Sequence, residues 1–113
     1  MNFRQLEPTH TIENIVYIEL LRRGYIVDIG SNSDKEIDFM ARDMNNTYYI
    51  QVSYSVIEPS TREREIASFR NLDDGYKKLV ITMDNDPFSN LGNGYKKLNM
   101  LDFLLDETSL EKA

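Results

Sequence analysis

Two short segments in the middle of the chain, residues 36–42 and 47–55, constrain the fold most. The second is β-branched or aromatic at most of its positions, which is typical of a strand. Residues 43–46, Asp-Met-Asn-Asn, separate the two segments and have the composition of a turn. The pattern predicts two adjacent strands, and if these pair as a hairpin, Asp38 can lie beside Gln51 and Ser53.

An acidic residue, Asp38, lies in the middle of the first predicted strand. A carboxylate is unusual in a sheet that is covered on both faces, because burying it without a partner is costly. The alternative is an edge or half-exposed strand in which Asp38 faces water. Successive side chains of a strand point to opposite faces of the sheet. In the first strand one face is predicted to carry Glu36, Asp38 and Met40, and the other Ile37, Phe39 and Ala41. In the second strand one face is predicted to carry Thr47, Tyr49, Gln51, Ser53 and Ser55, and the other Tyr48, Ile50, Val52 and Tyr54.

Helices are predicted at residues 11–23, 60–72 and 101–105. The first has apolar residues at helical spacing and is followed by Gly24, which suits a helix stop. Ser60 and Glu63 form a capping box that favours the start of the second. The apolar positions of the first helix are Ile12, Ile15, Val16 and Leu20.

The predicted elements follow one another in the order α-β-β-β-α-β-β-α. Three strands in a meander, followed by a crossover helix and a further strand, give an α/β domain with a central mixed sheet of about four or five strands flanked by helices. Residues 84–94 are expected to form a polar loop and the residues after 105 to fray. The strands are predicted at residues 25–29, 36–42, 47–55, 78–83 and 95–99.

At 113 residues, the chain is expected to be a single domain spanning residues 1–113. It has no Cys and a single His, so a zinc cluster and a thiol nucleophile are excluded. Its apolar runs are shorter than the roughly 20 residues of a membrane span, and its first residues lack the apolar core of a signal peptide. We expect a cytoplasmic protein without a membrane partner.

The chain has a net charge of −6 and a pI of about 4.7. Neutralisation of phosphates supplies much of the affinity of nucleic-acid binders, so this acidic balance disfavours nucleic acid as a partner. A local basic patch could still come from Arg62, Arg64, Arg70, Lys77 and Lys78. Two repeats, Gly-Tyr-Lys-Lys-Leu at 75–79 and 94–98, are either basic clamps or solvated strand entries, and we favour solvated strand entries.

Glu13 is the better of two candidate acids on the first predicted helix. Glu13 and Glu19 lie roughly 120° apart on a helical wheel, so they cannot serve one site. Glu19 has Arg22 and Arg23 three and four residues ahead, which is the spacing of surface ion pairs. Glu13 has apolar neighbours at those spacings, and we expect it to face the sheet.

Glu13, Asp38 and the Gln51-x-Ser53 pair together resemble the site of the PD-(D/E)xK (restriction-endonuclease-like) nucleases. In active members, the resemblance implies, a helix Glu, a strand Asp and a Glu-x-Lys pair bind Mg²⁺ and activate water. Here Gln51 stands in place of the second acid and Ser53 in place of the lysine. Gln is a poor ligand for hard Mg²⁺, and Ser supplies no positive charge.

The likeness can be narrowed to one domain and covers nearly the whole chain in order. The segments at 13–25, 34–39, 49–54, 64–65, 79–84 and 101–105 resemble the C-terminal domain of unknown function of prokaryotic AAA-type ATPases. In that family a P-loop ATPase module precedes the domain, so a P-loop module is the implied partner. This chain has no G-x-x-x-x-G-K-[ST] motif and cannot be the ATPase half.

The sequence therefore predicts a non-catalytic, nuclease-like accessory or regulatory domain with a degenerate site and no cofactor. The alternative is a Mg²⁺-dependent DNA endonuclease or resolvase-like enzyme with a displaced lysine, in which Glu13 and Asp38 hold the metal. Lys35, Arg62 or Arg64 would then complete the site. A third possibility is a partner-binding domain unrelated to nucleic acid, using Tyr48, Tyr49 and Tyr54 as its interface.

Overall fold

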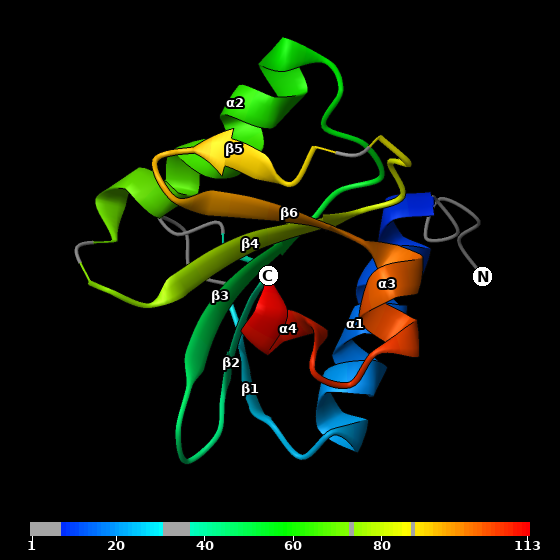
Figure 1. Cartoon of the computed structure of the whole chain (residues 1–113), viewed down its shortest axis with the longest axis vertical. Helices are drawn as coiled ribbons and strands as arrows, with labels where there is room; N and C mark the ends of the chain where they lie inside the picture. Colours follow the sequence, from blue (N-terminus) through cyan, green and yellow to red (C-terminus); the bar gives the residue numbers. More distant parts are fainter. Residues whose placement is uncertain (1–7, 31–36, 73, 87) are drawn as a thin grey trace.

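A mixed six-stranded sheet with helices on both faces organises the part of the chain that the computed structural model describes, residues 8–30, 37–72, 74–86 and 88–113 (Figure 1). The strand order is β1-β2-β3-β4-β6-β5. The first three strands form the predicted antiparallel meander. The strands are β1 (Ile26–Ile29), β2 (Phe39–Arg42), β3 (Thr47–Val52), β4 (Lys77–Thr82), β5 (Asn90–Gly92) and β6 (Tyr95–Asn99).

The β2–β3 hairpin confirms the central prediction from the sequence. Phe39 pairs with Ile50 and Ala41 with Tyr48, so their side chains share the face predicted for them. The turn is closed by Asp43, whose carboxylate accepts hydrogen bonds from the amides of Asn45 and Asn46 at 2.9 and 2.8 Å. Polar turn chemistry thus sets the register that brings residue 38 close to residue 51.

Helices divide between the two faces of the sheet. The first helix, α1 (Pro8–Arg22), shares one face with α3 (Met100–Leu105) and α4 (Ser109–Lys112). The crossover helix α2 (Pro59–Ala67) continues into the 3₁₀ turn η2 (Ser68–Asn71) and covers the opposite face. β3 and β4 are neighbours in the sheet and run parallel. Parallel neighbours need a crossover connection, and α2 with η2 provides it.

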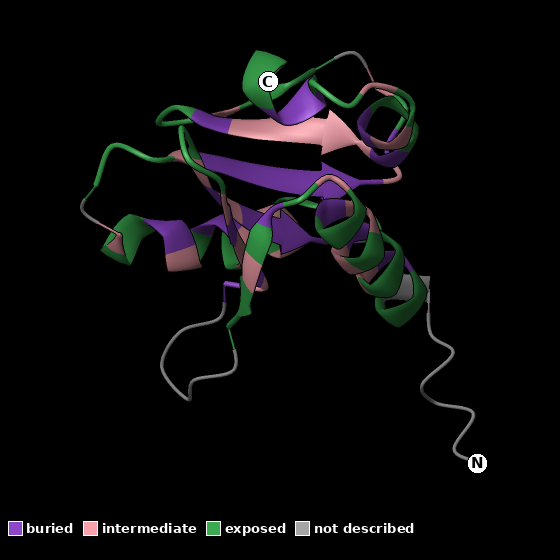
Figure 2. Cartoon of the chain, turned by 90° about the horizontal axis from the view of Figure 1, so that it is seen from below, coloured by how far each residue is buried: buried purple, intermediate pink, exposed green. Residues whose placement is uncertain are grey.

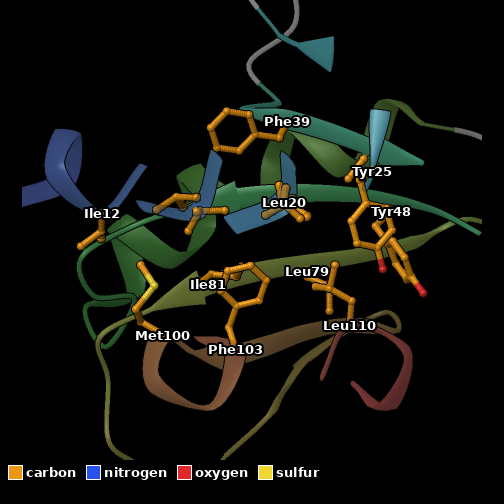
Figure 3. Close-up of a cluster of buried hydrophobic side chains, with 14 residues drawn as sticks. Ile12, Leu20, Tyr25, Phe39, Tyr48, Leu79, Ile81, Met100, Phe103 and Leu110 are labelled. Carbon is orange, nitrogen blue, oxygen red and sulfur yellow. The ribbon is translucent and has the colours of Figure 1, made fainter. Parts of the chain in front are cut away.

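The larger core lies between the sheet and the layer formed by α1, α3 and α4 (Figure 3). Val16 and Leu20 of α1 are fully buried there, one helical turn apart, together with Phe103 and Leu110. Each such side chain stabilises the fold by about 1.5–3 kcal/mol. Ile15 was predicted to join this stripe, but it is 39% exposed and lies on the outer side of α1, which Figure 2 colours mainly green.

A smaller core lies under α2 and contains Ile66, Phe69, Val80 and Tyr95. Ile37 also belongs to it, so the prediction that Ile37 shares a face with Phe39 is wrong. Strand alternation does not reach Ile37, because β2 begins only at Phe39. Glu36 lies outside the described residues.

Three further predictions need correction. The second helix begins at Pro59, with Glu58 as a cap that makes no side-chain hydrogen bond, so Ser60 and Glu63 do not form a capping box. The 84–94 loop contains the short strand β5. The residues after 105 do not fray, since they form α4 and bury Leu110 completely.

The two Gly-Tyr-Lys-Lys-Leu repeats are solvated at their glycines, as expected, but one lysine of each repeat is withdrawn from solvent. The Lys78 side chain is only 8% exposed and its ammonium lies 3.0 Å from Asp74. Lys97 is 9% exposed and lies 2.6 Å from Asp86. Both lysines therefore form internal ion pairs that tie a loop to a strand, and neither is available as a basic clamp. Among the helices of the described ranges, none combines the length and apolar composition needed to cross a membrane.

Candidate functional site

An acidic cavity of about 490 Å³ lies where α1, the β2–β3 hairpin and α2 meet. It brings together three of the four residues predicted for the site, Glu13, Asp38 and Gln51. The fourth, Ser53, is buried outside this cavity, where its hydroxyl donates to the Ser55 carbonyl at 3.0 Å. The remaining lining residues are Val52, Arg64, Glu65, Ala67 and Ser68.

Asp38 is held by the backbone of the neighbouring strand. Its Oδ2 accepts a 2.8 Å hydrogen bond from the Val52 amide. Its own carbonyl accepts a hydrogen bond from the Gly30 amide at 3.1 Å, which continues the pairing of β1 with the chain just before β2. The sequence therefore places a carboxylate at the mouth of the hairpin, half-buried and fixed in position, and not in open water.

Gln51 acts as a link between two elements. Its side chain is almost completely buried, and Oε1 accepts a 2.6 Å hydrogen bond from the Asp38 amide. At the other end of the carboxamide, Nε2 donates to the Glu65 carbonyl of α2 at 3.2 Å. A carboxylate could accept the first bond but could not donate the second, so this position is built for an amide.

Glu13 reaches the cavity from α1, and Glu19 does not, as predicted. Glu13 is half-buried, and burial raises its pKa, although His10, 3.9 Å away, lowers it in part. Glu19 instead lies 2.7 and 2.6 Å from the guanidinium groups of Arg22 and Arg23. The hydrogen bonds from Arg22 lead the effects that lower the Glu19 pKa to about 2.

Glu65 is the site residue that the sequence did not single out. It lies on α2 next to the buried Ile66 and adds a third carboxyl group to the cavity. Burial raises its pKa and the charge of Glu13 raises it further, while Arg64 lowers it. The only local sequence signal that could have indicated Glu65 is its position next to the apolar Ile66 on a predicted helix. Strand alternation, which placed Asp38 and Gln51, does not apply to a helix.

The three carboxyl groups disfavour one another's ionisation. Burial raises the pKa of Asp38 to about 7, and the negative charges of Glu13 and Glu65 act in the same direction, whereas the Val52 hydrogen bond opposes them. Among the described lining residues the only cation is Arg64. Arg62 faces elsewhere and donates to the Val56 carbonyl at 3.4 Å, and Lys35 lies outside the described residues.

Within the described ranges, no three His, Asp or Glu side chains converge closely enough to hold a metal ion. Of the three tyrosines considered above as a partner-binding interface, Tyr48 is buried, Tyr49 half-buried and Tyr54 exposed. Tyr48 is part of the larger core and Tyr49 packs against the smaller one. The three therefore do not form a continuous surface.

Comparison with known proteins gave one informative relative. The chain is 48% identical over 71 residues to a protein of Haemophilus influenzae described only as uncharacterised. The match covers 63% of this chain and 17% of the relative, so this chain spans only a small part of the relative's length. No protein-family model and no solved structure matched.

Proposed function

We propose that this chain is a restriction-endonuclease-like domain that has a degenerate nuclease site and serves as a non-catalytic accessory or regulatory module of an AAA-type ATPase. The observation that carries the proposal is the Gln51 carboxamide, which bonds the Asp38 amide and the Glu65 carbonyl at once. The position that holds a metal-binding acid in active nucleases is used here to join the hairpin to α2.

The topology supports the nuclease-like part of the proposal. A helix precedes a three-stranded antiparallel meander, and a helical crossover leads to a parallel fourth strand. Glu13 comes from the first helix and Gln51 from β3, as the resemblance implies, while Asp38 directly precedes β2, and the three residues line one cavity. Fold alone does not license activity, so the chemistry must be judged on the residues present.

Those residues support a site without catalysis. Gln51 offers no negative charge, and Ser53 lies outside the cavity with its hydroxyl bonded to Ser55. Among the described lining residues there is no lysine to assist a nucleophile. No cofactor is part of the proposal.

The accessory role is supported by the relative. The matched segment forms 17% of the Haemophilus protein, so a similar sequence there belongs to a much longer chain. The proposal places a P-loop ATPase module elsewhere in that longer chain. This sequence lacks the G-x-x-x-x-G-K-[ST] motif of such a module. The absence of Cys fits a reducing, cytoplasmic location.

A cleavage assay tests the degenerate site. The protein and its Asp38→Ala variant are incubated with labelled single-stranded, duplex and branched DNA in Mg²⁺ or Mn²⁺. We expect no metal-dependent product from either protein. Cleavage by the unaltered chain that the Asp38→Ala variant loses would overturn the non-catalytic assignment.

ATP hydrolysis tests the accessory role. The full-length Haemophilus relative is compared with a version that lacks the matched 71 residues. We expect the full protein to hydrolyse ATP and the deletion to change that rate. If the full protein does not hydrolyse ATP, the ATPase part of the proposal fails.

A metal-dependent nuclease remains the second candidate, because α2 adds both an acid and a cation to the cavity. Glu65 stands where a replacement for the missing second acid is needed, and Arg64 where a replacement for the missing lysine is needed. Within the described ranges the three carboxyl groups do not converge on one metal position, so this candidate requires them to move closer together when Mg²⁺ binds. Mg²⁺ would then raise the melting temperature more at pH 8, where Asp38 is ionised, than at pH 5. Loss of that difference in Glu65→Gln, together with metal-dependent cleavage, would favour this candidate.

A further inference from the structure

A second cavity, of about 460 Å³, lies between the start of α2 and the edge strand β5. It shares no lining residue with the acidic cavity. We call it the β5 groove and define it by Val56, Ile57, Arg62, Phe88, Asn90 and Leu91, with Asp86 and Lys97 at its wall. In Figure 1, α2 and β5 lie beside each other at one end of the molecule.

The groove presents large apolar side chains to solvent from two different segments. Ile57, just before α2, is 62% exposed, and Phe88, just before β5, is 74% exposed. Val56 is buried beneath them and Leu91 packs against the smaller core. Single exposed apolar residues are ordinary, but these two line the same cavity, so their apolar surfaces face one space.

The two cations that line the groove differ in their ion pairing. Asp86 accepts two hydrogen bonds from the Lys97 ammonium, at 2.7 and 2.6 Å, and the same ammonium lies 3.9 Å from the buried Asp84 carboxylate, so Lys97 is engaged by two acids. Within the described part of the chain, the Arg62 guanidinium donates only to the Val56 carbonyl at 3.4 Å, and it takes part in no ion pair there. The Arg62 guanidinium therefore lines an apolar groove without an ion-pair partner among the described residues.

We propose that the β5 groove binds an extended peptide segment of a partner protein in which an acidic residue neighbours large apolar residues. The carboxylate of the peptide pairs with Arg62, whose planar guanidinium can bind both oxygens. The apolar side chains of the peptide pack on Ile57 and Phe88. Aromatic and Arg side chains often supply most of the binding energy of an interface, so Phe88 and Arg62 are expected to be the main contacts.

Two features favour a peptide over nucleic acid. A polyanion needs several cations along its backbone, whereas Arg62 is the one uncompensated cation among the groove residues that the structure describes. β5 is also the last strand of the sheet, with only β6 beside it in the described chain, so its outer edge can accept an extended peptide.

Selection from a displayed library of random nonapeptides against the whole chain tests the proposal. We expect enriched sequences to carry Asp or Glu next to Leu, Ile, Phe or Tyr. A labelled copy of an enriched peptide should bind at least tenfold more weakly to Arg62→Gln and to Phe88→Ser. Arg70→Gln, a matched change at an exposed arginine that lines neither cavity, should bind as the unaltered chain does.

Several results would overturn the proposal. One is a selection in which no peptide is enriched more strongly on the unaltered chain than on the Arg62→Gln, Phe88→Ser double variant. Circular dichroism checks that all variants are folded. Enrichment of basic peptides is another. A third is a labelled oligonucleotide that binds in an Arg62-dependent manner while peptides do not. A fourth is an enriched peptide whose addition changes amide chemical shifts outside residues 56–62 and 88–91 and not within them, because the peptide would then bind at another site.

Discussion

The backbone amide of Asp38 donates a 2.6 Å hydrogen bond to the side-chain oxygen of Gln51, whose nitrogen in turn donates to the Glu65 carbonyl. One buried carboxamide thus joins the hairpin, the chain before β2 and helix α2. The geometry of the acidic cavity depends on this link, because Asp38 and Glu65 stand on either side of it.

Gln51→Glu should destabilise the fold by about 2–4 kcal/mol. The new carboxylate cannot donate to the Glu65 carbonyl and adds a negative charge beside three other carboxyl groups. Urea unfolding at pH 7.5 measures the loss. Asn14→Asp adds the same charge on the exposed side of α1 and should change stability by less than about 0.5 kcal/mol. Equal effects of the two changes would contradict the role of Gln51 as a link.

Asp38→Asn should make the protein more stable at pH 8, by about 1–3 kcal/mol. Burial raises the Asp38 pKa from 3.8 to about 7. Between these values the folded protein retains a proton that the unfolded chain has released, so stability falls as pH rises, and the full penalty remains above pH 7. Asparagine carries no such charge and can still accept from the Val52 amide.

Urea unfolding from pH 4 to pH 8 measures this effect as a shallower decline of stability in Asp38→Asn. Near pH 4 the folded carboxyl is protonated and the unfolded one only partly ionised, so little of the penalty remains and the two proteins should differ little. A variant that loses stability equally at every pH would show that the carboxylate is needed for structure and not disfavoured by burial.

Arg23→Ala should cost about 2–4 kcal/mol, because the Arg23 side chain is only 4% exposed and holds α1 against α3. Its guanidinium pairs with Glu19, donates to the Phe103 carbonyl and lies 4.4 Å from the centre of the Phe103 ring. Arg22 is 55% exposed, and its replacement by Ala should cost less than about 1 kcal/mol. Thermal unfolding of the two variants separates these outcomes.

Lys97→Met should cost about 2–4 kcal/mol, since it leaves Asp86 without its partner and removes the cation 3.9 Å from the buried Asp84. Lys96→Met, on the neighbouring position of the repeat, provides the control and should change stability by less than about 0.5 kcal/mol. Similar losses of stability in both variants would mean that removing either lysine destabilises the strand and that the Lys97–Asp86 ion pair has no special role.

The hairpin and the meander could be predicted because side-chain alternation and turn chemistry are local signals. Asp38 beside Gln51 followed directly from the pairing of residues 39 and 50. The choice of Glu13 over Glu19 was equally local, since the arginines that bind Glu19 lie three and four residues away.

What the sequence did not reveal depends on contacts between distant segments. Glu65 joins the site only through the packing of α2 on the sheet, and the partner of Lys97 lies eleven residues back in a loop. Likewise, the segment 109–112 looks polar, yet Leu110 packs in the larger core and Lys77 donates to the carbonyls of residues 110 and 111. The local pattern contained no sign of these partners.

The larger core unites the two ends of the chain, since Ile12 of α1 and Leu110 of α4 belong to the same buried cluster. During translation, the apolar side of α1 must therefore wait until residue 110 has left the ribosome before its core can close. Pairing of such distant segments slows folding and leaves apolar surface open meanwhile. The newly made chain should consequently depend on chaperones more than a domain with local contacts does.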